Sequence, residues 1–163
     1  AALLPPETKV KRRSVPTRFG SLILTEETEA VTRLSWGKEH EQVYRDASPL
    51  LDEAERQLLA YDAGTLTGFT LPLRVAGSQV VQDVCHAISA IPFGATQTYG
   101  DIARELGLSA QTVGQACGLN PIPVIVPCHR VMGVKGLTGY SGEGGVETKV
   151  ALLRHEGAAG LLI

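Results

Sequence analysis

The sequence predicts an α/β protein that is divided into two parts, and three observations support this prediction. The chain has 163 residues, which is enough for one domain or two small ones and for a core without disulfide bonds. Strand patterns precede a helix in the first half, whereas short helices dominate the second half. Residues 1–76 contain 10 basic and 11 acidic side chains, while residues 77–163 contain only 5 and 6. We therefore place a domain boundary near Ala76.

The first half is predicted to form a β-hairpin, a helix and an edge strand, in that order. Apolar and polar positions alternate in residues 19–36 on either side of the polar turn EETE, which is typical of a hairpin. Ser48 and the proline after it resemble an N-cap and a first helical residue. Apolar residues at helical spacing then predict a helix over residues 50–61. Residues 69–73 alternate again, but the proline among them favours the edge of a sheet.

The second half is predicted to contain a helix that begins at Ser78 and then a pair of short helices. Residues 99–106 and 110–117 have helical patterns and are separated by a turn that contains Gly107. Two short helices joined in this way are typical of a helix-turn-helix motif. Many helical hairpins bind nothing, however, and the small residues of AQTVGQAC also suit close packing against a neighbour. The pattern alone leaves both interpretations open.

A cysteine and a histidine follow the most apolar segment of the second half. Residues 122–126 form a nearly continuous apolar run, which predicts a buried strand that ends at Pro127. Cys128 then precedes His129, a candidate base, and Arg130, whose charge would favour the nucleophilic thiolate. Neighbouring residues on a strand point to opposite faces, so cooperation between Cys128 and His129 requires a turn or a bridging water. A cysteine of this kind is more often an inert core residue, and that interpretation also stays open.

The composition argues against several classes of protein. The net charge of −2 argues against broad, nonspecific binding of nucleic acid, so any such contact has to be local. No run of about 18 apolar residues predicts a membrane span, and the first residues have the wrong order for a signal peptide. The three cysteines lack a CxxC pair and the four histidines lack a ligand spacing, so we expect neither a disulfide framework nor a metal site. We expect a cytoplasmic protein.

Further features of the second half bear on a site. Glycines are dense between residues 133 and 145, which predicts either a linker or a loop whose N–H groups line a ligand pocket. A helix is predicted over residues 149–156. The helix dipole disfavours a carboxylate at its C-terminal end, so we expect Glu156 to have a partner elsewhere in the chain. Cys85 and Cys117 stand on apolar helix faces and are expected to be packing residues.

Several segments together resemble the O6-alkylguanine-DNA alkyltransferase family, the methylated-DNA–protein-cysteine methyltransferases, of the bacterial constitutive type. The family's motifs are matched by PCHRV at residues 127–131, by NPIPVIV before it, and by GLTGYSG and KVALLRHEG after it. Upstream, IPFGATQTYGDIA resembles the family's IPxGxxxxYGxIA segment. The resemblance covers residues 77–158 with high specificity and extends weakly over the first half.

The resemblance implies both a fold and a reaction. It implies an RNase H-like α/β domain at residues 1–76 and a winged-helix-like, helix-turn-helix domain at residues 77–163. It implies a monomer without cofactor or metal that binds double-stranded DNA containing O6-alkylguanine through the minor groove. The damaged base would be flipped out of the stack, because its reacting atom cannot be reached inside the duplex. Its O6-alkyl group, or that on O4 of thymine, would then pass irreversibly to Cys128.

The family's catalytic roles carry over to matching positions of this sequence. Cys128 would be the acceptor, His129 would be its base through a water molecule, and Glu156 would orient His129. Asn120 would join the second helix of the hairpin to the segment that carries Cys128.

Other matching positions would hold the guanine and the DNA. Tyr99 would rotate a phosphate outward and protonate the leaving guanine, with Lys149 nearby. The residues expected to contact the alkylated base are Pro123, Val131, Tyr140 and Ser141. The residues expected to contact DNA are Ala110, Gln111, Thr112, Gly114 and Arg130.

Three positions depart from the family's pattern: Ser78 stands where the family has Phe, Cys85 where it has Trp, and Gln111 where it has Arg. Family members carry an arginine finger in an R-A-V-G segment, which fills the gap left by the flipped base, whereas this chain has Gln111 in QTVG. Glutamine is shorter and uncharged, so it stacks less and lacks charge assistance. An alternative is therefore a module that recognises alkylated DNA with weak or no transfer, although such modules replace the acceptor cysteine. A Cys–His hydrolase is a third interpretation, but known thiol proteases take these residues from distant segments.

Overall fold

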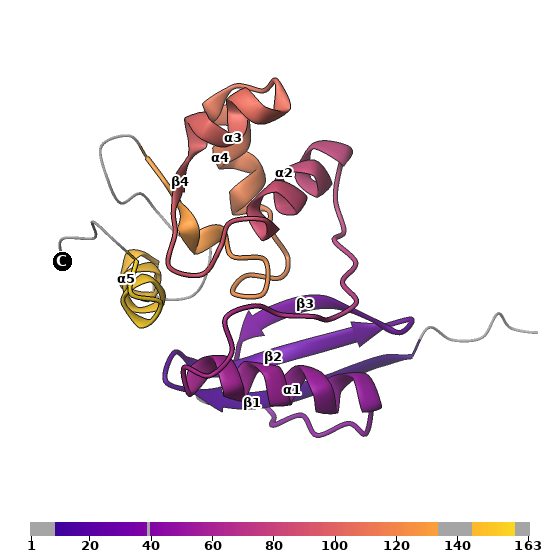
Figure 1. Cartoon of the computed structure of the whole chain (residues 1–163). Helices are drawn as coiled ribbons and strands as arrows, with labels where there is room; N and C mark the ends of the chain where they lie inside the picture. The colour runs from indigo at the N-terminus through magenta and orange to yellow at the C-terminus, as the bar shows by residue number, and fades with distance from the viewer. Residues whose placement is uncertain (1–8, 39, 134–144, 159–163) are drawn as a thin grey trace, which may run out of the picture.

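The computed structural model describes residues 9–38, 40–133 and 145–158, which form a part with a sheet and a helical part (Figure 1). The sheet is antiparallel, with the order β1 (Val10–Thr17), β2 (Gly20–Glu27) and β3 (Ala30–Trp36). Helix α1 (Pro49–Asp62) packs against it, and the side chain of Ser48 accepts a hydrogen bond from the Leu51 N–H as the predicted N-cap. The α/β class predicted from the sequence is confirmed.

The hairpin predicted over residues 19–36 corresponds to β2 and β3, but the sequence pattern did not reveal β1. The reason is that a charged side chain occupies an inward position in this strand. Arg13 is only 6% exposed, because its guanidinium donates to the backbone of Asp46 and to the carboxylates of Asp52 and Glu55. A buried, paired arginine interrupts the alternation of apolar and polar residues by which a strand is recognised.

The edge strand predicted over residues 69–73 is wrong. Leu73 makes a single parallel bridge to Val31 of β3, and no strand forms between residues 69 and 73. The Val31 N–H donates to the carbonyl of Pro72, and the Arg74 N–H donates to the carbonyl of Val31. The chain thus touches the sheet at one point and continues toward the helical part.

The helical part begins after this crossing and contains the predicted pair of short helices. A capping box between Thr98 and Asp101 begins the first of the pair, and Gly107 ends it with a φ of 68°. Ser109 caps the second. The helices are α2 (Gln79–Ser89), α3 (Tyr99–Leu106), α4 (Ala110–Gly118) and α5 (Val146–His155), with a parallel strand pair β4 (Gln97–Thr98) and β5 (Val131–Met132). None of the helices in the described ranges is long and apolar enough to cross a membrane.

The buried strand predicted over residues 122–126 is also wrong, although these residues are buried as expected. The segment is a turn in which Pro123 and Val126 make an isolated bridge and Val124 has a φ of 75°. A positive φ is unfavourable for a β-branched residue and persists only where surrounding contacts impose it. The side chain of Asn120 supplies such contacts at both ends of the turn.

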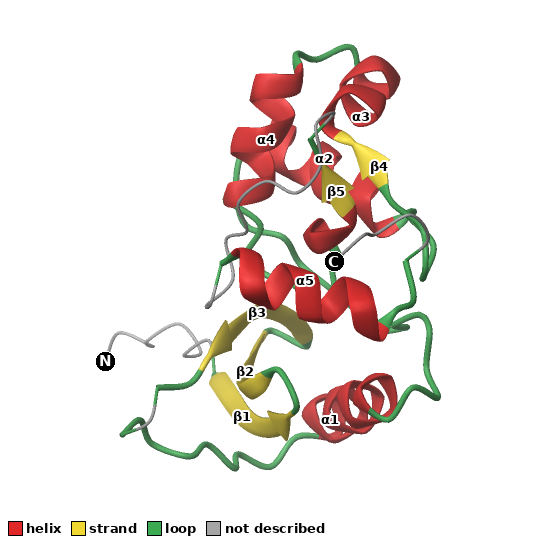
Figure 2. Cartoon of the chain, turned by 90° about the vertical axis from the view of Figure 1, so that its left-hand side faces the viewer, coloured by secondary structure: helices red, strands yellow, loops and turns green. Residues whose placement is uncertain are grey.

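The two parts meet along α5 and around one aromatic side chain of α1. Figure 2 shows α5 at a level between the sheet and the upper helices. The Tyr61 ring lies 5.0 to 6.2 Å, between centroids, from the rings of Phe19, Phe69, Phe93 and His155, which come from both parts. The core is therefore continuous across the boundary that the sequence suggests at Ala76.

Candidate active site

Cys128 begins a 3₁₀ turn at residues Cys128–Arg130, directly after the buried turn that replaces the predicted strand. The Cys128 N–H donates to the carbonyl of Val126 at 2.8 Å, and the Arg130 N–H donates to that of Pro127 at 2.9 Å. The local geometry therefore provides the turn that cooperation between Cys128 and His129 requires. Cys128 is a thiol with 5% exposure.

Asn120 fixes the backbone that delivers this turn. Its amide nitrogen donates to the carbonyl of Val126 at 2.9 Å, and its amide oxygen accepts from the Ile122 N–H at 2.9 Å. Asn120 lies two residues after the end of α4 and is itself buried. The end of α4 is thus joined to the residues immediately before Cys128, which is the contact that the family resemblance implies.

His129 and Glu156 form a fully buried hydrogen-bonded pair. Nε2 of His129 lies 2.7 Å from Oε2 of Glu156, and both side chains have 0% exposure. Glu156 is the C-cap residue of α5, so the expectation that this carboxylate has a partner elsewhere in the chain is confirmed. If Nε2 carries the proton, Nδ1 is left as the acceptor, and among the described residues Nδ1 has no hydrogen-bond partner.

Arg130 joins His129 and Glu156 in a buried cluster of charged and polar side chains. Its Nε donates to Oε1 of Glu156 at 2.8 Å, its Nη2 to Oε2 at 3.0 Å, and its Nη1 to the carbonyl of Ile91 at 2.7 Å. The expectation that Arg130 contacts DNA is therefore wrong, because this guanidinium is 6% exposed and committed to Glu156. Its charge is also balanced by that carboxylate, which reduces its effect on the Cys128 thiol.

The protonation states follow from burial and from these bonds. Burial favours the neutral form of Glu156, but hydrogen bonds from His129 and Arg130 outweigh it and lower the pKa of Glu156 to about 2. Burial lowers the pKa of His129, although the bond to Glu156 opposes this effect. Glu156 is therefore ionised and His129 neutral at neutral pH, as a general base must be.

Lys149 is the second buried cation near the thiol. It is 1% exposed, and its Nζ donates to the carbonyl of Val131 at 2.7 Å. Burial lowers the pKa of Lys149, and the charges of the Cys128 and Cys117 thiolates would raise it. A positive charge on Lys149 and a thiolate at Cys128 would therefore stabilise each other.

Cys85 and Cys117 behave as packing residues in the structure. Both are buried, and burial raises the pKa of Cys85 to about 11 and that of Cys117 to about 12. Neither sulfur is therefore ionised at neutral pH. The expectation from their apolar helix faces is confirmed.

The remaining predicted residues lie on or near the helical hairpin. Tyr99 is the first residue of α3, and its ring lies 4.0 Å from the point where a Cβ at Gly114 would stand. Gln111 is exposed on the first turn of α4, beside the exposed Ala110 and the half-buried Thr112. Of the residues expected to contact the alkylated base, Pro123 and Val131 are buried, while Tyr140 and Ser141 lie outside the described residues, as does most of the glycine-rich loop.

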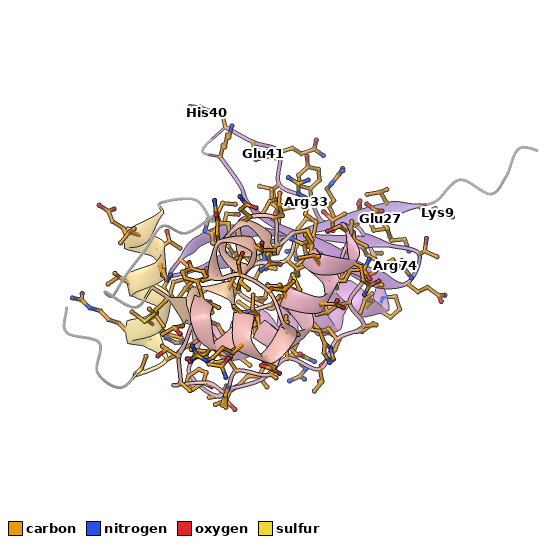
Figure 3. The ribbon with its side chains drawn as sticks, turned by 90° about the horizontal axis from the view of Figure 1, so that it is seen from above. Lys9, Glu27, Arg33, His40, Glu41 and Arg74 are labelled. Carbon is orange, nitrogen blue, oxygen red and sulfur yellow. The ribbon has the colours of Figure 1, made fainter. Side chains whose placement is uncertain are left out.

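Few cations of the second half are available to phosphates. Arg130 and Lys149 are buried, and Arg104 is paired with Asp101. Within residues 77–133 and 145–158, Arg154 is the one exposed cation outside an ion pair. Of the labelled residues of the first half, Lys9, Glu27 and Arg74 lie on the side of the molecule opposite α5 (Figure 3).

Sequence reasoning missed one member of the buried cluster. The hydroxyl of Tyr61, on α1, donates to Oε2 of Glu156 at 2.6 Å. The two residues are 95 positions apart, and Tyr61 fits the apolar helical pattern of α1. No local signal distinguishes it from an ordinary core aromatic residue.

The fold and the site define a class of protein: an α/β protein with an exposed helical hairpin and a buried Cys–His–Glu arrangement suited to thiol group transfer. Residues 79–158 match the family model described as 6-O-methylguanine DNA methyltransferase, DNA binding domain. The chain belongs to the methylated-DNA–protein-cysteine methyltransferase family, as the sequence motifs indicate.

Relatives and solved structures support this membership over most of the chain. The constitutive methylated-DNA–protein-cysteine methyltransferase of Bacillus subtilis is 38% identical over 86% of this chain and 91% of its own length. That of Mycobacterium leprae is 39% identical over 88% of this chain and 90% of its own. The Mycobacterium tuberculosis O6-methylguanine methyltransferase superposes with a TM-score of 0.78 at 40% identity, covering 91% of this chain and 93% of the other. The same protein in complex with DNA gives a TM-score of 0.79 at 39% identity, with the same coverage.

Proposed function

We propose that this protein is a single-turnover alkyltransferase that repairs O6-alkylguanine in double-stranded DNA by moving the alkyl group to Cys128. The observation that carries this proposal is the buried hydrogen bond between Glu156, at the end of α5, and His129, which follows Cys128 on the 3₁₀ turn. A carboxylate that fixes the tautomer of a neutral histidine beside a thiol is the arrangement that activates a nucleophilic cysteine.

The reaction follows from the order of these groups. The Cys128 thiol gives its proton, through water, to Nδ1 of His129, and Glu156 stabilises the imidazolium that results. The thiolate then attacks the alkyl carbon, so that an S–C bond forms while the C–O6 bond breaks. The electron pair of the broken C–O6 bond goes to the guanine, which takes a proton from Tyr99. The product is a thioether that the protein cannot reverse, so each molecule acts once.

Lys149 has two tasks in this scheme. Its ammonium stabilises the thiolate of Cys128, and its bond to the Val131 carbonyl holds β5 at the pocket. The second lone pair of that carbonyl stays available for the exocyclic amine of the flipped guanine. The carbonyl of Cys128 is the second acceptor for this amine, and Pro123, Tyr140 and Ser141 complete the proposed pocket.

DNA binding is assigned to the helical hairpin of a C-terminal domain at residues 77–163, which is winged-helix-like. Residues 1–76 form the RNase H-like domain in this proposal. The protein binds as a monomer, and helix α4 enters the minor groove of the duplex with Ala110, Thr112 and Gly114 in contact with the DNA. Gln111 fills the space left by the flipped base. The scarcity of exposed cations means that shape and backbone N–H groups contribute more than charge.

The test is a measurement of intact mass after incubation with a duplex that contains O6-methylguanine. Transfer adds one methylene, about 14 Da, and the gain is absent from Cys128→Ser. Tight binding of the damaged duplex without a gain in mass would refute the proposal and identify a recognition module instead. A parallel duplex with O4-methylthymine tests the second substrate in the same assay.

A further inference from the structure

Tyr61 connects the N-terminal half of the chain to the catalytic carboxylate. It lies in the last turn of α1, is 2% exposed, and donates its hydroxyl to Oε2 of Glu156 at 2.6 Å. Among the described residues, every other hydrogen-bond partner of the Glu156 carboxylate comes from the turn that carries Cys128. Tyr61 is thus the group from the first half that touches this cluster most directly.

Oε2 of Glu156, which accepts the hydrogen bond from Tyr61, also accepts hydrogen bonds from two other side chains. Oε2 of Glu156 accepts from Tyr61 at 2.6 Å, from Nε2 of His129 at 2.7 Å and from Nη2 of Arg130 at 3.0 Å. A carboxylate offers about four lone-pair sites over its two oxygens, so roughly two are available on Oε2. The Tyr61 hydroxyl therefore competes with the His129 imidazole for the same negative charge.

The hydroxyl is a permanent donor in this environment. Burial raises the pKa of Tyr61 far above its usual range, and the charge of Glu156 raises it further. The charged and titratable groups around the cluster come from several elements: Arg130 on the 3₁₀ turn, Lys149 and His155 on α5, Asp62 on α1, and Cys128 itself. None of them replaces the proton that Tyr61 donates to Oε2.

We propose that Tyr61 is a positioning residue that acts through Glu156 and holds down the proton affinity of His129. The inference rests on the proposed function in assigning His129 as the base of Cys128. With the Tyr61 hydroxyl in place, part of the charge on Oε2 is committed to α1, and the imidazolium gains less from it. Removal of the hydroxyl leaves more of that charge to the imidazolium, so the thiolate–imidazolium pair forms at a lower pH.

The test is the pH profile of Cys128 alkylation in Tyr61→Phe. Iodoacetamide is the probe, and peptide mass mapping assigns the product to Cys128 rather than to Cys85 or Cys117. Phenylalanine keeps the ring and its packing against the neighbouring rings. We expect the acidic limb of the profile to move down by roughly 0.5–1 pH unit, since a hydrogen bond to a charged group is removed but its charge is shared.

A matched control and an opposite perturbation make the result decisive. Tyr44→Phe removes a hydroxyl from a half-buried tyrosine of the same half that is not part of this cluster, and its profile should match the wild type. Replacement of Tyr61 by 3,5-difluorotyrosine gives a stronger donor and should move the limb to higher pH, which also covers the case in which Tyr61→Phe folds poorly. An unchanged limb in both Tyr61 variants, or a shift of Tyr61→Phe to higher pH, overturns the proposal.

The same two variants separate this inference from the proposed function. Iodoacetamide reports thiolate formation without any alkylated DNA, so a shifted profile supports the role of Tyr61 even if no alkyl group passes from guanine. Transfer from the O6-methylguanine duplex with an unshifted iodoacetamide profile supports the reaction and removes Tyr61 from it.

Discussion

Glu156 should contribute to stability in a strongly pH-dependent way, and Glu156→Gln tests this directly. The pKa of Glu156 is lowered from 4.5 to about 2 in the folded chain. A difference of about 2.5 pKa units corresponds to about 3 kcal/mol of stability at neutral pH. Breaking a buried ion pair on one side costs about 3–5 kcal/mol, because the other charge is left unpaired. Glu156→Gln leaves the buried charge of Arg130 without its partner. Both arguments therefore give a loss of about 3 kcal/mol or more in the free energy of unfolding at pH 7.

The sign of the pH dependence follows from the lowered pKa. The folded chain holds Glu156 ionised below the pH at which the unfolded chain protonates it, so the stabilisation is complete above about pH 5 and disappears toward about pH 2. We therefore expect the difference in the free energy of unfolding between the wild type and Glu156→Gln to become smaller as the pH falls. Urea unfolding followed by circular dichroism from pH 7 to pH 3 measures this difference.

A matched control is Glu105→Gln, which makes the same chemical change at an exposed residue of α3. It should change the free energy of unfolding by less than about 0.5 kcal/mol. Equal free energies of unfolding for the wild type and Glu156→Gln at pH 7, or a difference that stays constant with pH, would refute the reasoning about the buried carboxylate.

Three further predictions concern the hairpin and the turn. Gln111→Arg should raise the transfer rate on a duplex more than on free O6-benzylguanine, measured by quenched-flow mass spectrometry, and equal gains on both would show that the finger does not limit flipping. Asn120→Ala removes both hydrogen bonds that hold the 122–126 turn, so transfer to Cys128 should slow at least about tenfold, and an unchanged rate would contradict the anchoring role. The DNA association constant, measured by fluorescence anisotropy, should fall with salt concentration with a slope of about −2 to −4 on logarithmic axes. Arg154→Ala should reduce the magnitude of this slope by roughly 1, because it removes an exposed cation that can contact a phosphate. A slope steeper than about −6 would show that cations of the first half take part.

The helices were predicted well because their signals are local. Ser48, Thr98 and Ser109 each cap the helix that follows, and Gly107 adopts the left-handed conformation that ends α3. Such caps involve residues three or four positions apart, so the sequence alone contains the necessary information.

The strands were predicted less well because their partners and their burial are not local. The run at residues 122–126 has the apolar composition of a buried strand apart from Pro123, yet it forms a turn that the side chain of Asn120 holds at both ends. Residues 10–17 form a strand although Arg13 faces inward, because carboxylates from α1 neutralise it. In each case a specific polar contact overrides the apolar pattern.

The sequence by itself determined the family, and it predicted an acceptor cysteine, an adjacent base and a distant partner for Glu156. These conclusions rest on a contiguous motif or on the position of a charge within a single helix. Only the tertiary structure decided that Arg130 belongs to the interior and that Tyr61 shares an oxygen of Glu156 with His129. The physical reason is that proton affinity depends on every donor within hydrogen-bond distance, and packing brings those donors together from positions far apart in the chain.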